Sequence, residues 1–244
     1  MPACFKAQRL PRTGADDGTG LPLMTRVKIC GITRAEDALL AVELGASALG
    51  FNFYKPSPRY IEPRDARKIT AQTPPFVTAV GVFADEPDTS KIRMMAEQSG
   101  LGAVQLHGPR VPADLSALRA FPVIRAVAVS PNFDPSSLVG LTASAFLLDA
   151  CEPQLIGGTG KTIDWQQARE VRLMGYTIIL AGGLTAENAA TAIRAVRPYS
   201  VDVASGVESS PGIKDAAKLR AFFAAVEEAD RALRFAIRHD AGRA

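Results

Sequence analysis

The amino-acid sequence predicts an α/β protein that folds as a single (β/α)₈ TIM barrel. Eight short apolar runs recur along the chain, and segments with helical periodicity lie between them. Strands that alternate with helices of about ten to fifteen residues indicate parallel strands joined by right-handed crossovers. The eight units occupy about 203 residues, from Thr25 to Glu227, which is near the lower size limit of this barrel.

The eight apolar runs have the length of buried strands. In chain order they are RVKIC (26–30), ALGFNF (48–53), FVTAVGVF (76–83), AVQLH (103–107), PVIRAVAV (122–129), AFLLDA (145–150), YTIILAG (176–182) and YSVDVAS (199–205). Helical periodicity is clearest in three intervening segments, RAEDALLAVELG (34–45), PDTSKIRMMAEQSG (87–100) and TAENAATAIRAV (185–196). Helix-ending residues lie at or just beyond the ends of these segments, namely Gly45, Gly100 and Pro198.

A doubly wound open sheet is the structural alternative to the barrel. Such a sheet usually carries G-x-G-x-x-G after its first strand, whereas that position here reads CGITRA (30–35). The barrel is therefore the preferred interpretation.

The composition is that of an ordinary globular protein. The chain is 47% hydrophobic and 22% charged. Its net charge is +3, and the sequence contains no run of five or six like charges. Neither nucleic-acid nor membrane binding is therefore predicted. Cys4, Cys30 and Cys151 are odd in number, widely spaced and remote from any histidine cluster. This pattern argues against a disulfide framework and a zinc site, and it favours a cytoplasmic location.

The two ends of the chain are expected to lie outside the barrel. Residues 1–24 are rich in glycine and proline and lack the apolar segment of a secretory signal, so we predict a disordered extension. The barrel is expected over residues 25–227. Residues 228–244 are expected to extend the last helix and then fray.

A barrel gives direction to the side chains of each strand, because alternate residues point to opposite faces. Val27 and Ile29 are expected to face the helices, as are Leu148, Val201 and Val203. The residues predicted to face the barrel axis are Lys28, Cys30, Gln105, His107, Asp149 and Asp202. These polar residues gather toward the carboxyl ends of the strands, where enzymes of this fold keep their chemistry.

Two glycine-containing turns follow the seventh and eighth strands, AGGLTAEN (181–188) and ASGVESSPG (204–212). Such adjacent turns, each leading into a helix start with free N–H groups, form the usual phosphate site of this fold. Gly182, Gly183, Ser205 and Gly206 are the predicted donors. The alternative is a pair of tight turns with no ligand.

Cys30 and Asp149 end the first and sixth strands. Taken alone, Cys30 is most simply a packed small residue, but an inward position before Gly31 favours a functional thiol. We expect the charge of Lys28 to lower the pKa of this thiol, unless Asp202 on the adjacent eighth strand neutralises it. Asp149 either caps the next turn or acts as an acid whose pKa is raised by desolvation.

Three further features leave alternatives open. Arg59 in YKPSPRY (54–60) is either solvated or a bidentate clamp for a substrate carboxylate. His107 is either a pocket residue or a hydrogen-bonded core histidine. GGTGKT (157–162) lacks the first glycine of a P-loop, because Leu155 occupies that position, so a mobile lid is the better interpretation.

Taken together, these stretches resemble a known family. KICGITR, GFNFYKPSPRYI, VGVF, VQLHG, LLDA, GGTGKTIDW, LAGGLTAENA and VDVASGVESSPGIKD are similar, in order and spacing, to the phosphoribosylanthranilate isomerases of tryptophan biosynthesis. The resemblance runs from about Arg26 to Phe223. Ala181 and Ala204 stand where serine is common in the family, but both are small and keep the backbone donors.

The resemblance implies a barrel with no cofactor or metal, acting on a small phosphorylated sugar by an Amadori rearrangement. It implies that Cys30 is the general base, Asp149 the general acid and Arg59 the residue that holds the anthranilate carboxylate. Gly182, Gly183, Ser205 and Gly206 correspond to the phosphate loops, whereas Asp202 and His107 are further candidates for the pocket. The chain is expected to act as a monomer or a homodimer.

Two rival functions remain. The histidine-pathway sugar isomerase runs the same type of reaction but has aspartate at the position of Cys30 and a second phosphate site, and FADEP (83–87) and HGPR (107–110) lack the matching glycine pair. A non-catalytic phosphate binder on the same barrel is the other, and the presence of both Cys30 and Asp149 argues against it.

Overall fold

The structure is a computed structural model, and it describes residues 24–150 and 164–241. The proposed N-terminal extension and the GGTGKT segment, together with Cys4 and Cys151, lie outside the described residues.

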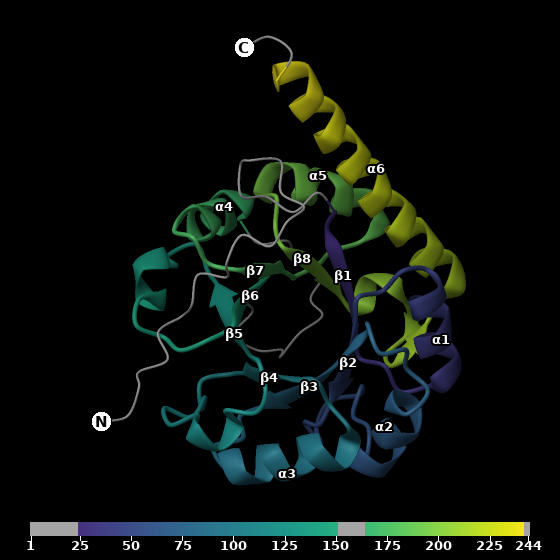
Figure 1. Cartoon of the computed structure of the whole chain (residues 1–244), viewed down its shortest axis with the longest axis vertical. Helices are drawn as coiled ribbons and strands as arrows, with labels where there is room; N and C mark the ends of the chain where they lie inside the picture. Colours follow the sequence, from purple (N-terminus) through teal and green to yellow (C-terminus); the bar gives the residue numbers. More distant parts are fainter. Residues whose placement is uncertain (1–23, 151–163, 242–244) are drawn as a thin grey trace.

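Eight parallel strands close into a barrel in the order of the sequence, as predicted (Figure 1). Their bounds are β1 (Arg26–Cys30), β2 (Ala48–Asn52), β3 (Thr78–Ala84), β4 (Ala103–His107), β5 (Val123–Val129), β6 (Ala145–Ala150), β7 (Ile178–Leu180) and β8 (Ser200–Val203). The closing pair, β1 and β8, is in parallel register, with Lys28 opposite Asp202. Closure leaves the sheet without free edges.

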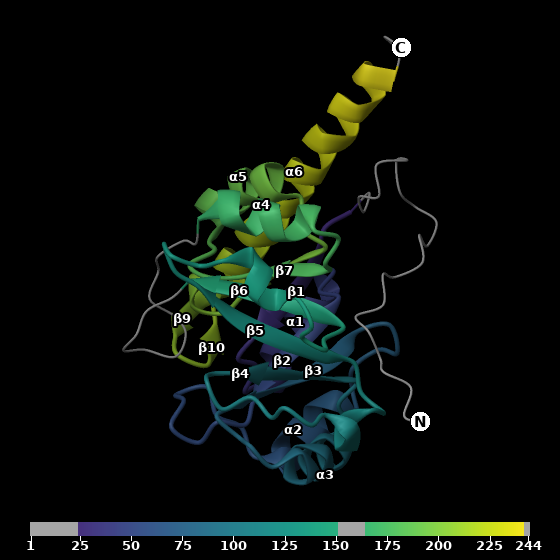
Figure 2. The ribbon, with the colours of Figure 1, turned by 90° about the vertical axis from the view of Figure 1, so that its left-hand side faces the viewer.

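In the described part of the chain, six α-helices surround the barrel. They are α1 (Ala35–Glu43), α2 (Pro63–Thr70), α3 (Thr89–Ser99), α4 (Trp165–Leu173), α5 (Ala186–Val196) and α6 (Ala216–Ala241). The three clearest periodic segments thus form α1, α3 and α5. Figure 2 shows the last turns of α6 extending away from the barrel. Within the described residues, no helix is long and apolar enough to cross a membrane.

Two crossovers contain no α-helix, so the expected alternation is wrong at these points. The β4–β5 connection holds only the short 3₁₀ turn η1 (Ser116–Leu118), and the β5–β6 connection holds only η2 (Pro135–Leu138). Proline explains both cases, because Pro109 and Pro112 precede η1, and Pro131 and Pro135 occupy the start of the second connection. A proline within a helix removes a backbone donor and clashes with the preceding turn.

The barrel has two apolar layers, and they confirm the predicted facing of the strands. Val27, Ile29, Leu148, Val201 and Val203 belong to the large cluster between the strands and the helices. A smaller cluster fills the interior of the barrel and consists of Val80, Ala103, Ile124, Ala145, Leu147, Ile179 and Ala181. Most of its members lie in the first halves of their strands. The amino-terminal part of the barrel interior is therefore apolar, and the polar side chains lie toward the carboxyl ends of the strands.

The start and the end of the barrel are fastened to each other. The buried carboxylate of Asp230 on α6 accepts a hydrogen bond from the backbone N–H of Thr25 at 2.8 Å and one from its hydroxyl at 2.7 Å. The Arg26 guanidinium lies 4.3 Å from the centre of the Tyr199 ring, just before β8. These contacts join residues about two hundred positions apart and fix the beginning of β1.

A small two-stranded ribbon follows β8 on the carboxyl side of the barrel. The chain first makes the 3₁₀ turn η3 (Ser205–Val207) and then the antiparallel strands β9 (Glu208–Ser210) and β10 (Ile213–Lys214). Pro211 and Gly212 connect these strands, and Gly212 has a φ of 82°, which suits the third position of a type II turn. The ribbon thereby brings Glu208 and Lys214 back over the end of β1.

Candidate functional site

Cys30 ends β1 on the inner side of the barrel and is partly exposed. Its neighbour on β2 is Gly50, and a Cβ atom there would lie 2.8 Å from the Cys30 Sγ and 3.1 Å from the Lys28 Nζ. Glycine at this position therefore leaves the thiol and the ammonium the space that they occupy. Gly31, with a φ of 76°, turns the chain directly after the thiol.

Lys28 and Asp202 form an ion pair below Cys30. The Lys28 Nζ lies 2.8 Å from the Asp202 Oδ1, and the Lys28 side chain is only 2% exposed. Burial alone works against the ammonium, but Asp202 and Cys30 outweigh it, and the pKa of Lys28 is raised. The two opposite charges are thus held in fixed positions between β1 and β8, beneath the thiol.

The pKa of Cys30 is raised, which contradicts the expectation of a thiol with a lowered pKa. Burial is the largest cause, because it disfavours the thiolate, while the nearby Lys28 acts in the opposite direction. Asp202 adds to the increase by placing a negative charge nearby. The expectation counted the charge of Lys28 but gave too little weight to desolvation.

Asp149 is the next-to-last residue of β6, and its pKa is raised to about 6 by burial and, to a smaller extent, by the charge of Asp202. The expected increase is therefore confirmed. Its Oδ1 accepts a hydrogen bond from the backbone N–H of Ala150 at 2.8 Å. Asp149 and Cys30 share the electrostatic neighbours Lys28 and Asp202, so the two proton-transfer candidates lie around one ion pair.

The two glycine-containing turns lie against each other. A Cβ atom on Gly206 would overlap the carbonyl group of Leu184, in the other turn. Gly182 and Gly183 have φ angles of 83° and 61°, and a Cβ atom on Gly182 would lie 3.0 Å from the Asp149 Oδ1. The turns therefore meet at the same end of the barrel as Asp149.

Backbone N–H groups of both turns remain available. The Asn188 side chain holds the first turn, because its Oδ1 accepts from the Thr185 N–H at 2.9 Å and its Nδ2 donates to the Gly183 carbonyl at 2.8 Å. Among the described residues, nothing accepts a hydrogen bond from the N–H groups of Gly183, Ser205 or Gly206. This arrangement of donors suits an anion.

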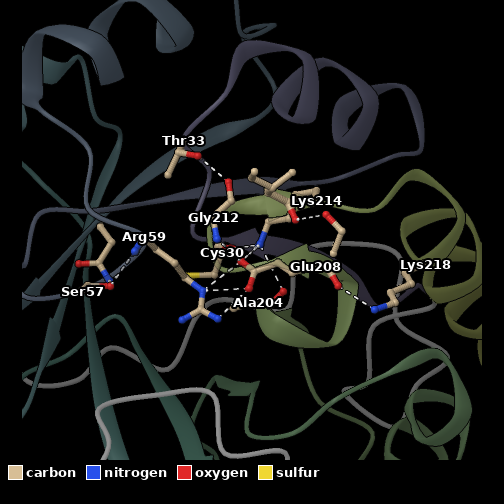
Figure 3. A network of polar contacts seen from close by, with 12 residues as sticks. Cys30, Thr33, Ser57, Arg59, Ala204, Glu208, Gly212, Lys214 and Lys218 are labelled. Carbon is tan, nitrogen blue, oxygen red and sulfur yellow. Dashed lines mark hydrogen bonds and ion pairs between the residues drawn. The ribbon is translucent and has the colours of Figure 1, made fainter.

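Arg59 belongs to a polar network beside Cys30 that is centred on Glu208 (Figure 3). Its Nε and Nη2 contact the Glu208 carboxylate at 3.0 and 2.7 Å, and its stem packs against Gly31. The Lys214 ammonium contacts the same carboxylate at 2.8 Å and also donates to the backbone carbonyl of Cys30 at 2.5 Å. The network thus ties the ribbon after β8 to the end of β1.

Glu208 and Lys214 are not among the site residues predicted from the sequence. Both are buried, which is unusual for charged side chains unless they are paired. The available signal was the acidic Glu208 and the basic Lys214 within VESSPGIKD (207–215), which follows the eighth strand. The pairing of Glu208 with Arg59 joins residues 149 positions apart and is not visible in any local pattern.

His107 ends β4 and is partly exposed, and burial lowers its pKa while Asp85 opposes this change. Gln105, two residues earlier on the same face, is buried. Lys28 and Asp202 are weaker electrostatic neighbours of His107. His107 therefore belongs to the rim of the same interior. Across residues 24–150 and 164–241, no three His, Cys, Asp or Glu side chains form a group that could hold a metal ion.

Comparison with known proteins gives a consistent result. The family model described as N-(5'phosphoribosyl)anthranilate (PRA) isomerase matches residues 27–225. The N-(5'-phosphoribosyl)anthranilate isomerase of Trichlorobacter lovleyi is 49% identical over 211 residues, which cover 84% of this chain and all of that protein.

Two solved structures are similar over the same part of the chain. The phosphoribosyl anthranilate isomerase of Thermotoga maritima has 45% identity and a TM-score of 0.78, covering 84% of this chain and 100% of that one. A phosphoribosyl anthranilate isomerase in complex with reduced 1-(o-carboxyphenylamino)-1-deoxyribulose 5-phosphate has 42% identity and a TM-score of 0.75, with the same coverage. The chain therefore belongs to the N-(5'-phosphoribosyl)anthranilate isomerase family.

Proposed function

We propose that the chain converts N-(5-phosphoribosyl)anthranilate to 1-(2-carboxyphenylamino)-1-deoxyribulose 5-phosphate, with Asp149 as general acid and Cys30 as general base. The observation that carries this proposal is the placement of both groups around the Lys28–Asp202 pair, between the two glycine-containing turns and Arg59. The reaction needs only proton transfers within one molecule.

The first step opens the sugar ring. The Asp149 carboxyl donates its proton to the ring oxygen while the bond from that oxygen to C1 breaks, and the nitrogen lone pair forms a C1–N double bond. A carboxyl with a pKa of about 6 is partly protonated near neutral pH, whereas an ordinary aspartate is almost fully ionised. Burial of Asp149 therefore supplies the acid.

The second step removes the proton from C2. The Cys30 thiolate takes this proton, and the released electron pair forms a C1–C2 double bond and neutralises the iminium nitrogen. The resulting enolamine then tautomerises to the ketone. The iminium cation from the first step favours the thiolate electrostatically, which offsets the raised pKa of Cys30 at the moment when a base is needed.

The remaining residues hold the substrate. The phosphate is placed on the backbone N–H groups of Gly182, Gly183, Ser205 and Gly206, and Arg59 holds the anthranilate carboxylate. Asp202 is assigned mainly to its ion pair with Lys28, and its negative charge also helps to keep Asp149 protonated.

Growth of auxotrophs tests the substrate. A plasmid with this gene is expected to rescue a bacterial strain that lacks phosphoribosylanthranilate isomerase. It is expected to fail in a strain that lacks the histidine-pathway sugar isomerase. Rescue of the histidine strain alone would overturn the proposal, and rescue of neither strain by the folded protein would favour a non-catalytic binder.

We predict that Gly206→Ala raises KM by about tenfold or more, because the added methyl group overlaps the Leu184 carbonyl and moves the turn. Steady-state kinetics with the phosphorylated substrate measure this effect. Gly102→Ala is the matched control, since its new Cβ atom would make only ordinary contacts at 3.4 Å or more. An unchanged KM in Gly206→Ala would remove this turn from the phosphate site.

A further inference from the structure

The Arg59 guanidinium has two edges that can each bind a carboxylate through paired N–H groups. Glu208 occupies the edge formed by Nε and Nη2, with contacts of 2.7 to 3.2 Å. On the other edge, Nη1 makes no hydrogen bond with any described residue, and Nη2 has a second N–H besides the one that it gives to Glu208. Glu208 therefore fixes the orientation of Arg59 and leaves one complete edge for a ligand.

An arginine paired with one carboxylate is electrically neutral as a unit and attracts a second carboxylate only weakly. Lys214 changes this balance, because its ammonium also contacts Glu208, and the group of Arg59, Glu208 and Lys214 carries a net charge of +1. The Lys214 side chain is fully buried and the Glu208 side chain is 4% exposed, so water screens these charges poorly. The surplus charge acts at the open edge of Arg59.

We propose that Glu208 and Lys214 are positioning residues that determine specificity for the substrate carboxylate. Glu208 aims the open edge of Arg59, and Lys214 supplies the positive charge that remains after Glu208 is neutralised. This inference rests on the proposed role of Arg59. The new element is that the preference for a carboxylate on the aromatic ring depends on Lys214, which acts through Glu208 and Arg59.

The test compares two reduced product analogues, one with the 2-carboxyl group on the phenyl ring and one without it. Binding is measured by titration calorimetry. Lys214→Met is expected to weaken binding of the carboxylate analogue by about 10- to 100-fold and to change binding of the other analogue by less than about threefold. Lys218→Met is the matched control, because Lys218 donates to the Glu208 backbone carbonyl and not to its carboxylate.

Two further variants separate the possible outcomes. Glu208→Gln keeps an acceptor for Arg59 and raises the net charge of the group, so it is expected to retain the preference for the carboxylate analogue. This variant tests the charge argument independently of whether Lys214→Met folds. An equal loss of this preference in Glu208→Gln would overturn the charge argument, as would an unchanged preference in Lys214→Met. An unchanged preference in Arg59→Met would instead contradict the proposed role of Arg59.

A separate observation concerns the opposite end of the barrel. The last turns of α4 and α5 lie side by side and line an open pocket of about 370 Å³ with Arg169, Arg172, Arg194 and Arg197. Among the described residues, no carboxylate forms an ion pair with any of the four. The buried Arg172 Nε has no hydrogen-bond partner. Burial and the charges of Arg197 and Arg169 lower the pKa of Arg172.

The C-terminal ends of the two helices favour cations, but they supply only about one half-charge each. Four guanidinium groups around a pocket of this size therefore keep a surplus of positive charge and of planar N–H donors. We infer that this pocket binds a small, multiply charged phosphate anion, because guanidinium groups pair with phosphate oxygens in a bidentate manner.

Inorganic diphosphate is the probe, and the carboxylate-bearing product analogue first saturates the catalytic site so that only other sites respond. Calorimetry is expected to show one diphosphate bound to the wild-type chain and at least tenfold weaker binding to Arg172→Gln/Arg194→Gln, with kcat unchanged. Arg93→Gln on α3 is the control. Absence of binding to the wild type, or equal binding to the double variant, would overturn this assignment.

Discussion

Replacement of Cys30 with serine is expected to lower kcat by about 10²- to 10⁴-fold, which is the usual contribution of a positioned proton-transfer group. A hydroxyl group of similar size is far less acidic than a thiol, so the variant has no effective base for the proton on C2. The phosphate turns and Arg59 are untouched, and affinity for the reduced product analogue should stay within a few-fold of the wild-type value. Steady-state kinetics and calorimetry measure the two quantities separately.

Cys30→Asp provides the informative comparison. A carboxylate is a base, so this variant should recover part of the activity that Cys30→Ser loses, although its shape and charge differ from those of the thiolate. If turnover in Cys30→Ser equals that of the wild type, Cys30 has no part in the proton transfer. If analogue affinity falls as steeply as kcat, Cys30 acts in binding.

Asp149→Asn is expected to lower kcat by a similar factor, because the amide cannot donate a proton to the ring oxygen while that bond breaks. The amide oxygen can still accept the hydrogen bond from the Ala150 N–H, so the local structure should persist. In the wild type, the limb of the kcat/KM profile that falls above pH of about 6 should report Asp149. This limb should be absent from the residual activity of the variant.

The same substitution should stabilise the folded chain near neutral pH. The pKa of Asp149 rises from its ordinary value of 3.8 to about 6 on folding, so the folded state holds its proton more tightly than the unfolded state. Stability from this group is complete below pH of about 4 and is lost as the pH rises through about 6. The loss amounts to about 2–3 kcal/mol.

Urea denaturation at pH 4 and at pH 7.5 measures this linkage. The asparagine variant lacks the titrating group and should be more stable than the wild type at pH 7.5 by about 1–3 kcal/mol. An identical dependence on pH in the two proteins would show that Asp149 is not the group with the raised pKa. Stability gained at the expense of activity is the expected sign of a catalytic acid held in an unfavourable environment.

Much of the barrel was predictable because its signals are local. A strand such as AFLLDA (145–150) shows its period, its apolar length and its polar end in six consecutive residues, and the structure has the strand at those residues. The missing helices before β5 and β6 were also encoded locally, in prolines that the reading of a regular alternation passed over. The alternation of strand and helix in the other units therefore does not predict a helix in a connection that contains several prolines.

The polar details were harder to predict because they depend on burial and on distant pairs. The direction of the pKa shift of Cys30 results from competition between desolvation and Lys28, and only the folded packing decides it. Lys28 and Asp202 could be paired from the barrel register alone. The pairing of Arg59 with Glu208 depends on how two loops fold, and no periodicity specifies it.

The hydrogen bonds between Thr25 and Asp230 indicate that the chain is suited to circular permutation. Because the start of β1 and the body of α6 are held within hydrogen-bond distance, a short peptide bridge could join them without crossing the barrel. New termini could then be opened in the helix-free connection near η2, giving a circular permutant with the same ring of strands. The closed ring of strands, and not the order of the units along the chain, would then keep Cys30 and Asp149 at the same end of the barrel.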